Sequence, residues 1–477
     1  MKLKTFRRGI HPNDGKSLSA ESPIRLIPAV GDCVYPLSQH IGAPAVPVVA
    51  VGDRVLAGQR LADAGGFVSA PIYSSISGTV KAIGPHASGS GENVLCITVE
   101  NDDLDEWVDP AFKPENNPFT TLEAVKRAMA SEPLLSMDKA AIRAAVREAG
   151  IVGLGGAGFP TAVKLTPKDD DAIDYFIVNA AECEPYLTSD YRLMLERPHQ
   201  LLAGCELILR LFPKARCVIG VENNKPEAIK LLSELCMKGE HRITVCPLKA
   251  KYPQGGERML IKAVTGREIN STLLPSAVGC IVINVASVIA AFRACALGAP
   301  LTHRIMTITG DGVKAPANLE VPIGISHRAL MAATGGFDGA PRKIISGGPM
   351  MGTAIFTTDI PVTKTSASVL AFQADPVALN DTTACIRCGK CLAACPERLV
   401  PTKLAEAAER DDLASFERYG GMECIECGSC VYVCPAKRHL VQSMRYGKRQ
   451  TGAIIRARKA AEQSNARENA QRGGNKV

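Results

Sequence analysis

A cysteine pattern that occurs twice near the C-terminal end constrains this chain more than any other feature. Residues 385–396 and residues 424–435 each read C-x2-C-x2-C-x3-C-P. Three thiolates at this spacing can wrap around one side of an iron–sulfur cubane, whereas the fourth cysteine lies too far along the chain and, in runs of this kind, ligates the neighbouring cluster. The pattern therefore predicts two [4Fe–4S] clusters with exchanged fourth ligands: Cys385, Cys388, Cys391 and Cys434 for the first, and Cys424, Cys427, Cys430 and Cys395 for the second.

Structural zinc is the alternative, because paired C-x2-C hooks commonly hold one tetrahedral ion. Zinc, however, leaves the third cysteine of each run and the following proline without a role. Between the two runs, apolar residues recur at helical spacing, and Gly420-Gly421 ends the pattern. We expect residues 373–440 to form a two-cluster domain, with a helical insert between the two cysteine runs. Because each cluster accepts one electron, an electron source is expected upstream.

Length and composition indicate several folded domains. The chain has 477 residues, of which 46% are hydrophobic and 22% charged, which excludes wholesale disorder and coiled coil. No apolar stretch follows the charged first residues, and with 17 cysteines a reducing compartment is expected. The most apolar stretch, residues 277–297, contains Asn284, Ser287 and Arg293 and predicts a buried strand followed by a buried helix rather than a membrane span.

Basic residues are concentrated at the end of the chain. Residues 436–477 carry a net charge of +9, whereas the rest of the chain carries −2. We expect a basic tail over residues 441–477 that docks on an anionic membrane surface or on partner subunits, with a disordered end as the alternative. No nucleic-acid partner is expected, because Tyr446 is the tail's one aromatic residue.

The first hundred residues consist of short apolar runs separated by Gly, Pro and Asp turns, which predicts β structure. Residues 44–85 resemble the barrel-sandwich hybrid of biotinyl and lipoyl carriers. Such carriers present a modifiable lysine at a hairpin tip, but the corresponding turn at residues 69–75 has none. A structural or docking barrel over residues 1–115 is therefore expected instead of a swinging arm.

A glycine-rich segment opens the central part of the chain. Residues 153–158 read G-L-G-G-A-G, a match to G-x-G-x-x-G. A dinucleotide fingerprint needs a strand before the glycines and a helix after them, whereas here a helical pattern precedes and Phe159-Pro160 follow. The glycines alone thus predict close backbone approach to a planar or phosphorylated ligand.

Polar residues follow the next predicted strands. Residues 174–180 form an apolar run that ends at Asn179 and leads to Glu182 and Glu184, at the strand end where open α/β sheets bind ligands; a solvated loop is the alternative. Residues 252–257 contain a Gly-Gly-Glu turn. Asn284 and Ser287 can cap the helix that follows the strand at 280–284 and leave N–H groups for a phosphate.

In this order, the motifs over residues 137–297 resemble the FMN- and NADH-binding subunit of respiratory complex I and related flavin dehydrogenases. Residues 306–335 resemble the soluble-ligand-binding β-grasp domain that follows in that family. The resemblance implies catalytic roles for Glu184, Glu182 and Lys164. It implies FMN contacts from Gly153, Gly155, Gly158, Lys164, Asn179, Glu182, Tyr252, Gly255, Gly256, Asn284 and Ser287, and NADH contacts from Gly156, Phe159, Glu184 and Glu257.

Over nearly the whole chain, to about residue 439, the order of motifs resembles the C subunits of Rnf-type membrane electron-transport complexes. The resemblance covers FRRGIHP at residues 6–12, AECEPYLTSDYRLM at 181–194 and YPQGGE at 252–257. The chain departs from the complex I subunit in two ways. Its cysteine pattern is different, and residues 267–279, REINSTLLPSAVG, stand where the complex I subunit has its NADH segment. Ala181 also stands where that subunit has an aspartate.

The Rnf resemblance implies an NADH-oxidising subunit that lies peripherally on the cytoplasmic face of the bacterial inner membrane. A hydride would pass from NADH to FMN, and single electrons would then pass through both clusters to partner subunits and to ferredoxin or flavodoxin, coupled to ion translocation. The alternatives are a flavin–iron–sulfur cobalamin reductase of the microcompartment type and a non-catalytic cluster scaffold. The expected fold is multidomain α/β and α+β: a barrel-sandwich hybrid (1–115), a Rossmann-like FMN/NADH domain (120–300), a β-grasp domain (301–372), a two-cluster ferredoxin-like domain (373–440) and the tail (441–477).

Overall fold

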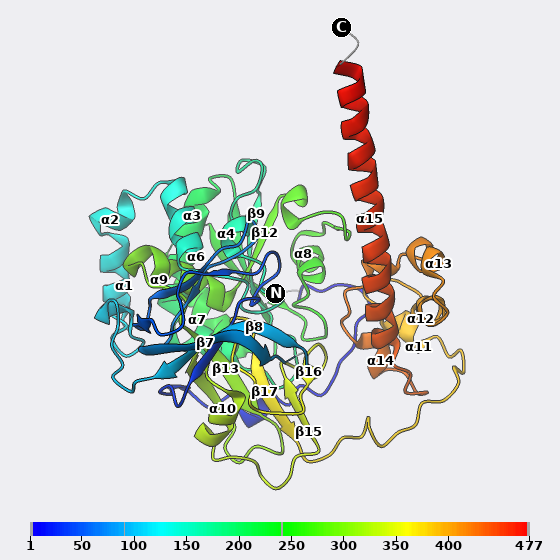
Figure 1. Cartoon of the computed structure of the whole chain (residues 1–477), viewed down its shortest axis with the longest axis horizontal. Coiled ribbons are helices and arrows are strands. Elements are labelled where there is room, and N and C mark those ends of the chain that lie inside the picture. The colour runs from blue at the N-terminus through cyan, green and yellow to red at the C-terminus, as the bar shows by residue number, and fades with distance from the viewer. Residues whose placement is uncertain (1–2, 90, 240–241, 475–477) are drawn as a thin grey trace. The chain divides into compact units, whose positions relative to one another are not determined.

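The computed structural model describes residues 3–89, 91–239 and 242–474 (Figure 1). The chain divides into two compact units. The first unit comprises Met1–Thr5, Pro12–Ile269 and Leu274–Asp375, and the second comprises Phe6–His11, Asn270–Leu273 and Pro376–Val477. The flavin-type motifs lie in the first unit and the two cysteine runs in the second.

A four-stranded parallel sheet forms the centre of the first unit. Its strand order is β11-β10-β9-β12, with bounds Ile243–Leu248, Arg216–Glu222, Tyr175–Ala180 and Cys280–Asn284. The chain runs from β9 outward to β11 and then returns to the other side of β9, so the strand order reverses between β9 and β12. In open α/β sheets, ligands bind at the carboxyl ends of the strands at such a reversal.

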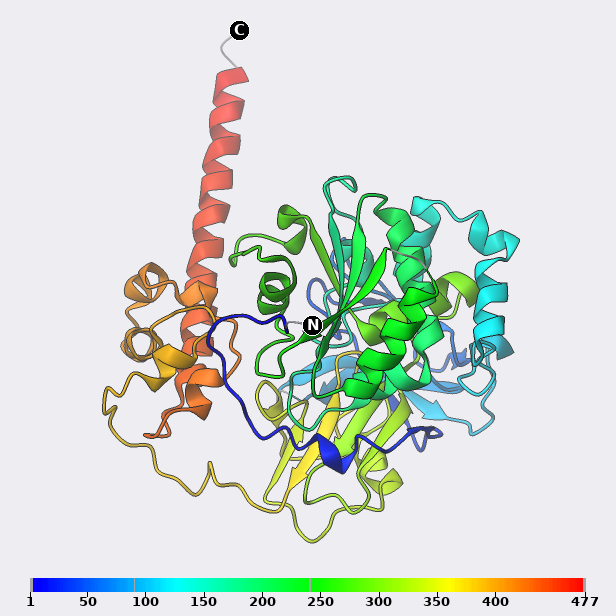
Figure 2. The ribbon, with the colours of Figure 1, turned by 180° about the vertical axis from the view of Figure 1, so that it is seen from behind.

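Helices cover both faces of this sheet, as Figures 1 and 2 show. On one face, Phe176 and Val178 pack with residues of α6 (Pro198–Leu211) and α9 (Val285–Leu297). On the other face, Ile177 packs with residues of α8 (Glu257–Thr265). Burial on both faces explains why the strands read as continuous apolar runs. The prediction of a buried strand and helix over residues 277–297 is confirmed by β12 and α9.

The remaining helices of the first unit flank this sheet. α1 (Leu122–Met129), α2 (Glu132–Leu135) and α3 (Lys139–Glu148) precede the glycine-rich segment, α4 (Thr161–Lys164) follows it, and α5 (Ser189–Glu196) and α7 (Pro226–Met237) connect later strands. A helix, not a strand, therefore precedes the glycines, as the sequence predicted.

The N-terminal part of the first unit is an antiparallel sandwich. One sheet has the order β2-β8-β7-β4 (Cys33–Pro36, Asn93–Asn101, Gly78–Ala87 and Arg54–Val55), and the other the order β3-β5-β6 (Val46–Pro47, Arg60–Asp63 and Ile72–Tyr73). Leu61, Ile72 and Ile97 lie in its core. Lys81, on the exposed side of β7, contacts Asp32 and Glu100.

A six-stranded mixed sheet completes the first unit. Its order is β1-β14-β13-β17-β15-β16, with bounds Ile24–Leu26, Ala317–Pro322, His303–Thr309, Ser368–Phe372, Lys343–Ser346 and Thr353–Ala354, and α10 (His327–Ala333) follows β14. Ile308 of this sheet shares one apolar cluster with Leu61 of the sandwich. The sandwich and the mixed sheet thus have a common core rather than two separate ones.

The second unit is helical around the cysteine runs. It contains α11 (Lys390–Ala394), α12 (Pro401–Glu409), α13 (Leu413–Arg418), α14 (Ser429–Tyr432) and α15 (Leu440–Gly474), drawn in orange and red in Figure 1. Two helices, α12 and α13, lie where the spacing of apolar residues predicted a helical insert. Phe416 is fully buried, and a Cβ on Gly421 or Gly447 would clash with its ring. These glycines therefore permit the close packing of this small core.

The basic tail is helical wherever the structure describes it. α15 spans Leu440–Gly474, and residues 475–477 of the predicted tail lie outside the described residues. Leu440 and Met444 are buried in the core of the second unit, so the first turns of the helix belong to the folded domain.

Among the described residues, no helix is both long enough and apolar enough to cross a membrane.

Candidate functional site

The reversal of strand order brings two asparagines side by side. Asn179 at the end of β9 is the register partner of Asn284 at the end of β12. Asn284 caps α9, because its Oδ1 accepts a hydrogen bond from Ala286 N (2.9 Å), and its Nδ2 donates to Asp190 Oδ2 (2.6 Å). Asn179 Nδ2 donates to Gly255 O (2.8 Å). Both predicted residues thus lie at the carboxyl edge of the sheet and hold neighbouring segments in place.

The glycine loop, residues 153–158, lies against the start of α9. Ser287 Oγ accepts a hydrogen bond from Leu154 N (3.0 Å) and donates to Val152 O (2.9 Å). The prediction that Ser287 caps α9 is therefore wrong: its hydroxyl binds the loop because the loop carries an unpaired N–H and C=O within reach. The Ser287 contacts fix the position of the loop instead.

Two glycines of this loop have opposite surroundings. A Cβ on Gly155 would lie 2.5 Å from Asn284 Nδ2, whereas nothing lies within 4 Å of a Cβ on Gly156. Gly155 is thus required for packing, while the backbone at Gly156 borders open space. Gly158 has φ +72°, a conformation that favours glycine.

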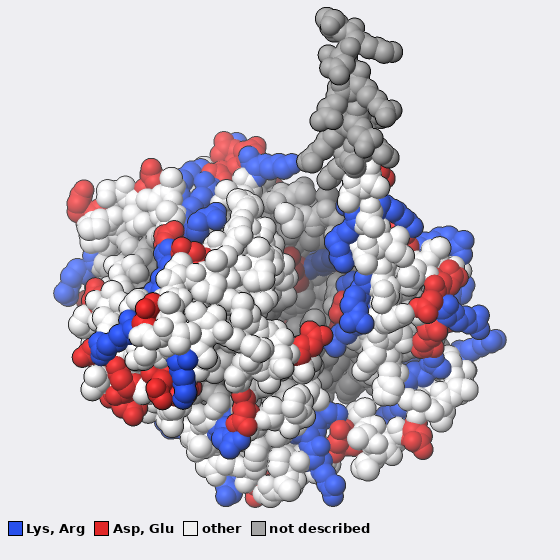
Figure 3. All heavy atoms as spheres, in the orientation of Figure 1, with Lys and Arg blue, Asp and Glu red and all other residues white. Residues whose placement is uncertain are grey.

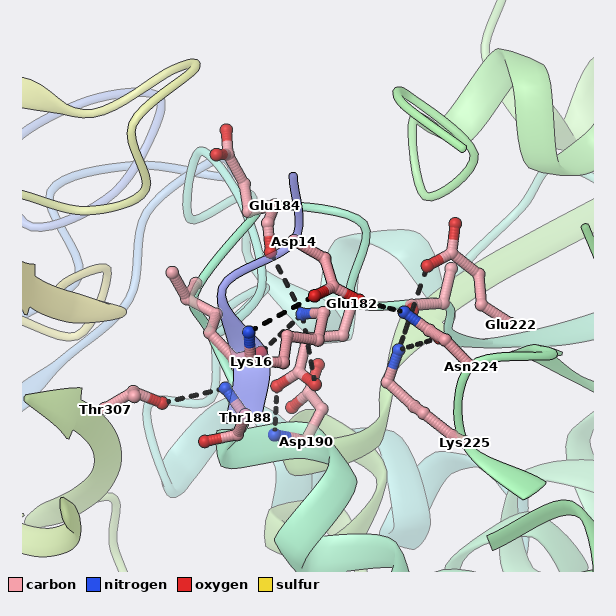
Figure 4. Close-up of polar contacts among 12 residues, drawn as sticks. Asp14, Lys16, Glu182, Glu184, Thr188, Asp190, Glu222, Asn224, Lys225 and Thr307 are labelled. Atoms are coloured by element: carbon pink, nitrogen blue, oxygen red, sulfur yellow. Dashed lines mark hydrogen bonds and ion pairs between the residues drawn. The ribbon is translucent and has the colours of Figure 1, made fainter. Parts of the chain in front are cut away.

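The acidic loop, residues 181–187, follows β9 and is held by two buried lysines (Figure 4). Lys16 Nζ donates to Glu184 O (3.0 Å) and Leu187 O (2.5 Å) and lies 3.9 Å from Glu182 Oε2. Lys225 Nζ donates to Ala181 O (2.7 Å) and lies 3.8 Å from Glu222 Oε2. Both lysines therefore bind backbone carbonyls of this loop; Lys16 also lies near the charge of Glu182, whereas Lys225 pairs with Glu222 at the end of β10.

Backbone strain accompanies this arrangement. Glu182 has φ +49° and Tyr186 φ +72°, which residues with a Cβ seldom adopt. Glu182 Oε1 accepts a hydrogen bond from Asp190 N (2.7 Å), and its Oε2 is buried without one. Strained backbone of this kind is concentrated at ligand sites, and here it carries a carboxylate oxygen that accepts no hydrogen bond and has Lys16 as its ion-pair partner.

Burial shifts the proton affinity of these carboxyl groups. It raises the pKa of Glu184 to about 7, against the stabilising N–H groups of Met350 and Met351. Burial and the nearby charge of Glu182 together raise the pKa of Asp190 to about 7. Burial also raises the pKa of Glu222 to about 7 and lowers that of Lys16. The site can therefore hold or release protons near neutral pH.

Glu184 is bound by a segment that the sequence did not indicate. Its carboxylate accepts hydrogen bonds from Met350 N (3.2 Å) and Met351 N (2.9 Å), and a Cβ on Gly348 would clash with it. Residues 348–351 follow β15 in the mixed sheet. Lys16 was also missed from sequence. Neither Lys16 nor the segment at 348–351 has a motif or a spacing that connects it with the acidic loop.

Lys164 and Glu257 come from separate motifs but form an ion pair. Lys164 Nζ lies 2.7 Å from Glu257 Oε2, and it also donates to Val282 O (3.1 Å). Glu257 is the first residue of α8, and Gly256 is its N-cap. A cofactor contact from Lys164 would therefore be made beside the charge of Glu257.

The Gly-Gly turn before α8 is packed against β9. A Cβ on Gly255 would lie 3.1 Å from Cys183 Sγ. Tyr252 is buried, and both polar atoms of the neighbouring Gln254 amide are buried without a hydrogen bond. Phe159, at the end of the glycine loop, is half-buried and accepts a hydrogen bond from Gly153 N through its carbonyl. The free backbone at Gly156, the Gln254 amide and Glu182 Oε2 fit a polar, planar ligand such as a flavin.

Four thiols of the second unit line one recess. Cys395, Cys424, Cys427 and Cys430 are among its lining residues, with Val441 and Met444 in its apolar walls. Burial raises the pKa of Cys430, and the nearby charges of Cys427, Cys424 and Cys395 raise it further. Cys395, from the first run, thus lies with the three leading cysteines of the second run.

The other four cysteines show the reciprocal arrangement. Burial raises the pKa of Cys391, and the charges of Cys434 and Cys385 add to this. Cys385 and Cys388 are exposed. Nowhere in residues 3–89, 91–239 and 242–474 do three such side chains lie close enough together to hold one metal ion. In both sets a cysteine of one run lies near cysteines of the other, which is the arrangement expected of two cubanes that exchange their fourth ligands.

Comparison with known protein families gives four matches along the chain. Residues 4–104 match the RnfC barrel sandwich hybrid domain, 146–293 the Nuo51 FMN-binding domain, 305–354 the SLBB domain and 378–435 the 4Fe-4S dicluster domain. The order agrees with the domains expected from sequence. The chain therefore carries an FMN-binding domain and a domain for two [4Fe–4S] clusters.

Full-length relatives are similar over almost the entire chain. The chain is 43% identical to the C subunit of the proton-translocating ferredoxin:NAD(+) oxidoreductase complex of Clostridium ljungdahlii, over 96% of each protein. It is 42% identical to the C subunit of the Na(+)-translocating ferredoxin:NAD(+) oxidoreductase complex of Acetobacterium woodii, over 94% of this chain and 98% of the relative. Its fold is similar to that of an air-oxidized NAD+-reducing [NiFe]-hydrogenase, with a TM-score of 0.50 at 22% identity over 67% of this chain and 65% of the other.

Proposed function

The chain belongs to the C subunits of Rnf-type ion-translocating oxidoreductase complexes, and we propose that it is the peripheral subunit through which NADH delivers electrons to such a complex. The partners would be the other subunits of the complex, with ferredoxin or flavodoxin as the eventual acceptor. The protein would lie on the cytoplasmic face of the bacterial inner membrane.

One observation supports this proposal above all: a site that fits a flavin and two sets of cluster thiols occur on one chain. A bound flavin exchanges two electrons with a nicotinamide and single electrons with iron–sulfur centres. A chain with both sites can therefore convert hydride chemistry into one-electron transfer. A cluster scaffold without a flavin would have no need of the buried acidic loop and its two lysines.

The chain's own residues have separable roles in this proposal. The glycine loop and the capped start of α9 would hold the phosphate, because backbone N–H groups and a helix N-terminus favour anions. Lys16 and Lys225 would keep the acidic loop in its strained conformation. Glu184, with a pKa near 7, would hold or release a proton at its carboxylate beside the nicotinamide.

A pair of glycine variants tests the flavin site. In Gly156→Val the new side chain should occupy the open space beside the loop, so NADH should no longer reduce the clusters, whereas dithionite should still reduce both. Gly84→Val is the matched control, because nothing lies within 4 Å of a Cβ on Gly84 and this glycine lies in β7 of the sandwich. Rapid-mixing absorbance of the cluster bands measures both reactions. Normal NADH-driven reduction in Gly156→Val would remove the glycine loop from the site.

The microcompartment type of cobalamin reductase is the second candidate function. The match of residues 4–104 to the RnfC barrel sandwich hybrid domain favours the Rnf-type function over it. Purified protein should transfer electrons from NADH to a ferredoxin-linked membrane fraction faster than to cob(III)alamin, and the reverse preference would overturn the proposal.

A further inference from the structure

A second cavity lies in the first unit, on the side of α9 that faces the mixed sheet. It is partly open to solvent and is lined by Ala286, Ile289 and Arg293 of α9. These positions are spaced three and four residues apart, so they share one helical face. Leu193 of α5 and Ile305 of β13 supply further apolar wall.

The charges around this cavity do not balance. Arg197 forms a two-point ion pair with Glu320, with 3.2 Å from Nη1 to Oε1 and a second contact from Nη2 to Oε2. This pair uses the carboxylate of Glu320, the one acidic side chain among the lining residues. Arg293 and Arg304 also line the cavity, so its lining has three guanidinium groups and one carboxylate. Burial lowers the pKa of Arg304 to about 9, and the charge of Asp190, which is not in the lining, opposes this shift. Burial also lowers the pKa of Arg293, against the charge of Glu320.

The two additional arginines have unused donors. Arg304 is 6% exposed; its Nη atoms donate to Leu154 O (3.2 Å) and Lys364 O, but its Nε is buried without a partner. Arg293 Nε is also buried without a partner, and within the described residues Arg293 donates no hydrogen bond. A buried guanidinium N–H without an acceptor is costly, and the Nε atoms of both arginines are such donors.

We propose that this cavity binds a small organic anion, with its carboxylate or phosphate group on Arg293 and Arg304 and its apolar body against Leu193, Ile289 and Ile305. Guanidinium groups bind such oxyanions through paired N–H donors, which gives both strength and orientation. The cavity borders the proposed flavin site, because Leu154 of the glycine loop and Ala286 in the first turn of α9 are among its lining residues. The inference does not rest on the proposed function, since Arg293, Leu193 and Ile305 are not among the residues assigned to the flavin.

A natural reporter group lies beside the cavity. Trp107 is the only tryptophan of the chain. Its ring stacks on His303, a lining residue, with ring centroids 6.0 Å apart and an interplanar angle of 22°. Anion entry next to His303 should change the emission of Trp107.

The experiment titrates full-length, cofactor-loaded protein with four probes and follows both Trp107 emission and heat release. Hexanoate and hexyl phosphate carry the anion and the apolar body, acetate carries only the charge, and 1-hexanol only the body. We expect saturable binding of hexanoate or hexyl phosphate that is about tenfold or more tighter than that of acetate and hexanol, and their ratio identifies the preferred head group. No saturable binding of either amphiphilic anion, or equally tight binding of acetate or hexanol, would overturn the proposal.

Variants connect the binding to the cavity. Arg293→Gln should weaken the tighter probe about tenfold or more, whereas Arg293→Lys should retain part of the affinity because it keeps the charge. Arg328→Gln is the matched control, since Arg328 is an exposed arginine that pairs with Asp359 away from the cavity. Equal affinity in wild type and in both Arg293 variants would show that the anion binds elsewhere and overturn the assignment. If Arg293→Gln does not fold, the affinity of Arg293→Lys and the probe series still show whether the anion binds in the cavity.

Discussion

The flavin site and the cluster sites are assembled in different ways from the same chain. The eight cluster cysteines lie within 50 residues, and the recess that four of them line is formed by residues between 395 and 444. The proposed flavin site would join segments far apart in the chain: Lys16, the acidic loop, Lys225, α8, α9 and residues 348–351. The first is a local structure, and the second depends on contacts across more than 300 positions of sequence.

The difference also extends to what stabilises each site. The thiols need a metal cluster to neutralise their charge, so the second unit depends on its cofactors. The acidic loop is stabilised by buried lysines and backbone N–H groups of the protein itself. A single substitution should therefore disable one cluster in the second unit, but should unfold or loosen the surroundings of the whole site in the first.

The largest expected effect is the loss of one cluster through a change in the other run. Cys395→Ser and Cys427→Ser should delete the same [4Fe–4S] signal, and Cys434→Ser should delete the signal that Cys388→Ser also removes, because the fourth ligands are exchanged. EPR of the dithionite-reduced variants measures this. Cys246→Ser, a half-buried cysteine outside both runs, should retain both signals. If Cys395→Ser and Cys388→Ser instead lose the same signal, each run holds its own cluster.

Removing a buried lysine should have the next largest effect. Lys225 is 1% exposed, and Lys225→Met leaves the charge of Glu222 and the carbonyl of Ala181 without their partner. We expect a loss of about 3 kcal/mol in the free energy of unfolding of the first unit, together with loss of flavin, while both clusters remain. Urea unfolding followed by Trp107 emission measures the first unit, because Trp107 lies there.

The control for that variant is Lys214→Met, at an exposed lysine 3.4 Å from Asp171. It should change stability by no more than about 0.5 kcal/mol. A Lys225→Met protein as stable as Lys214→Met, with normal flavin content, would show that the buried lysine does not hold the acidic loop.

The same contrast explains what could be predicted from sequence. The cluster ligands follow from spacing alone, because a cubane needs thiols at defined intervals along one short stretch. Asn179, Glu182 and Asn284 could be found because each follows an apolar strand of a parallel sheet. Lys16 and residues 348–351 could not, since nothing in their own sequence records which distant backbone they contact.

Ser287 and the tail show a further limit. The position of Ser287 in the first turn of α9 is compatible with capping, but a nearby loop with unpaired backbone groups bound the hydroxyl instead. The net charge of the tail predicted docking on an anionic membrane or on partner subunits. Two of its basic residues, Arg445 and Lys448, instead form ion pairs with Glu426 within the second unit. Composition gives the number of charges and not their partners.

Loss of the proton that Asp190 holds in the fold should make the first unit less stable as pH rises. Asp190 has a pKa of about 7 in the fold, against about 3.9 in an unfolded chain, so between these values the folded state holds a proton that the unfolded state has lost. The free energy of unfolding should fall by about 1.4 kcal/mol per pH unit through this window for each such group. The stabilisation that comes from the raised pKa of Asp190 is therefore fully present below about pH 4 and lost above about pH 7.

Asp190→Asn should flatten this pH dependence, because the amide cannot titrate and can still accept the hydrogen bond of Asn284 Nδ2. Thermal unfolding followed by Trp107 emission at pH 5, 6, 7 and 8 gives the slope. Asp359→Asn, at an exposed aspartate that pairs with Arg328, should keep the wild-type slope. Identical slopes in all three proteins would show that Asp190 ionises in the fold as it does in water.

The smallest expected effect concerns the distal half of α15. Residues up to Thr451 belong to the second unit, because Met444 and Thr451 are buried and Gly447 packs on Phe416. Figure 3 shows basic side chains along the described part of the helix, and of these Lys448 and Arg445 are already paired with Glu426. Ending the chain after residue 452 removes a net charge of +4 and leaves that core intact.

Both clusters and NADH oxidation with ferricyanide should therefore be unchanged in the shortened chain, but its binding to vesicles with anionic lipid should weaken. Each basic residue near such a surface contributes on the order of 1 kcal/mol, and salt should reduce the difference because charges are screened beyond roughly 10 Å at 0.1 M. Cosedimentation with vesicles at low and high salt measures this. Replacing Arg456, Arg458 and Lys459 by Gln should have a similar effect, whereas replacing Lys214, Lys238 and Arg328 should not. If the shortened chain binds vesicles as the full chain does, the distal helix serves partner subunits rather than lipid, and the membrane role of the tail is wrong.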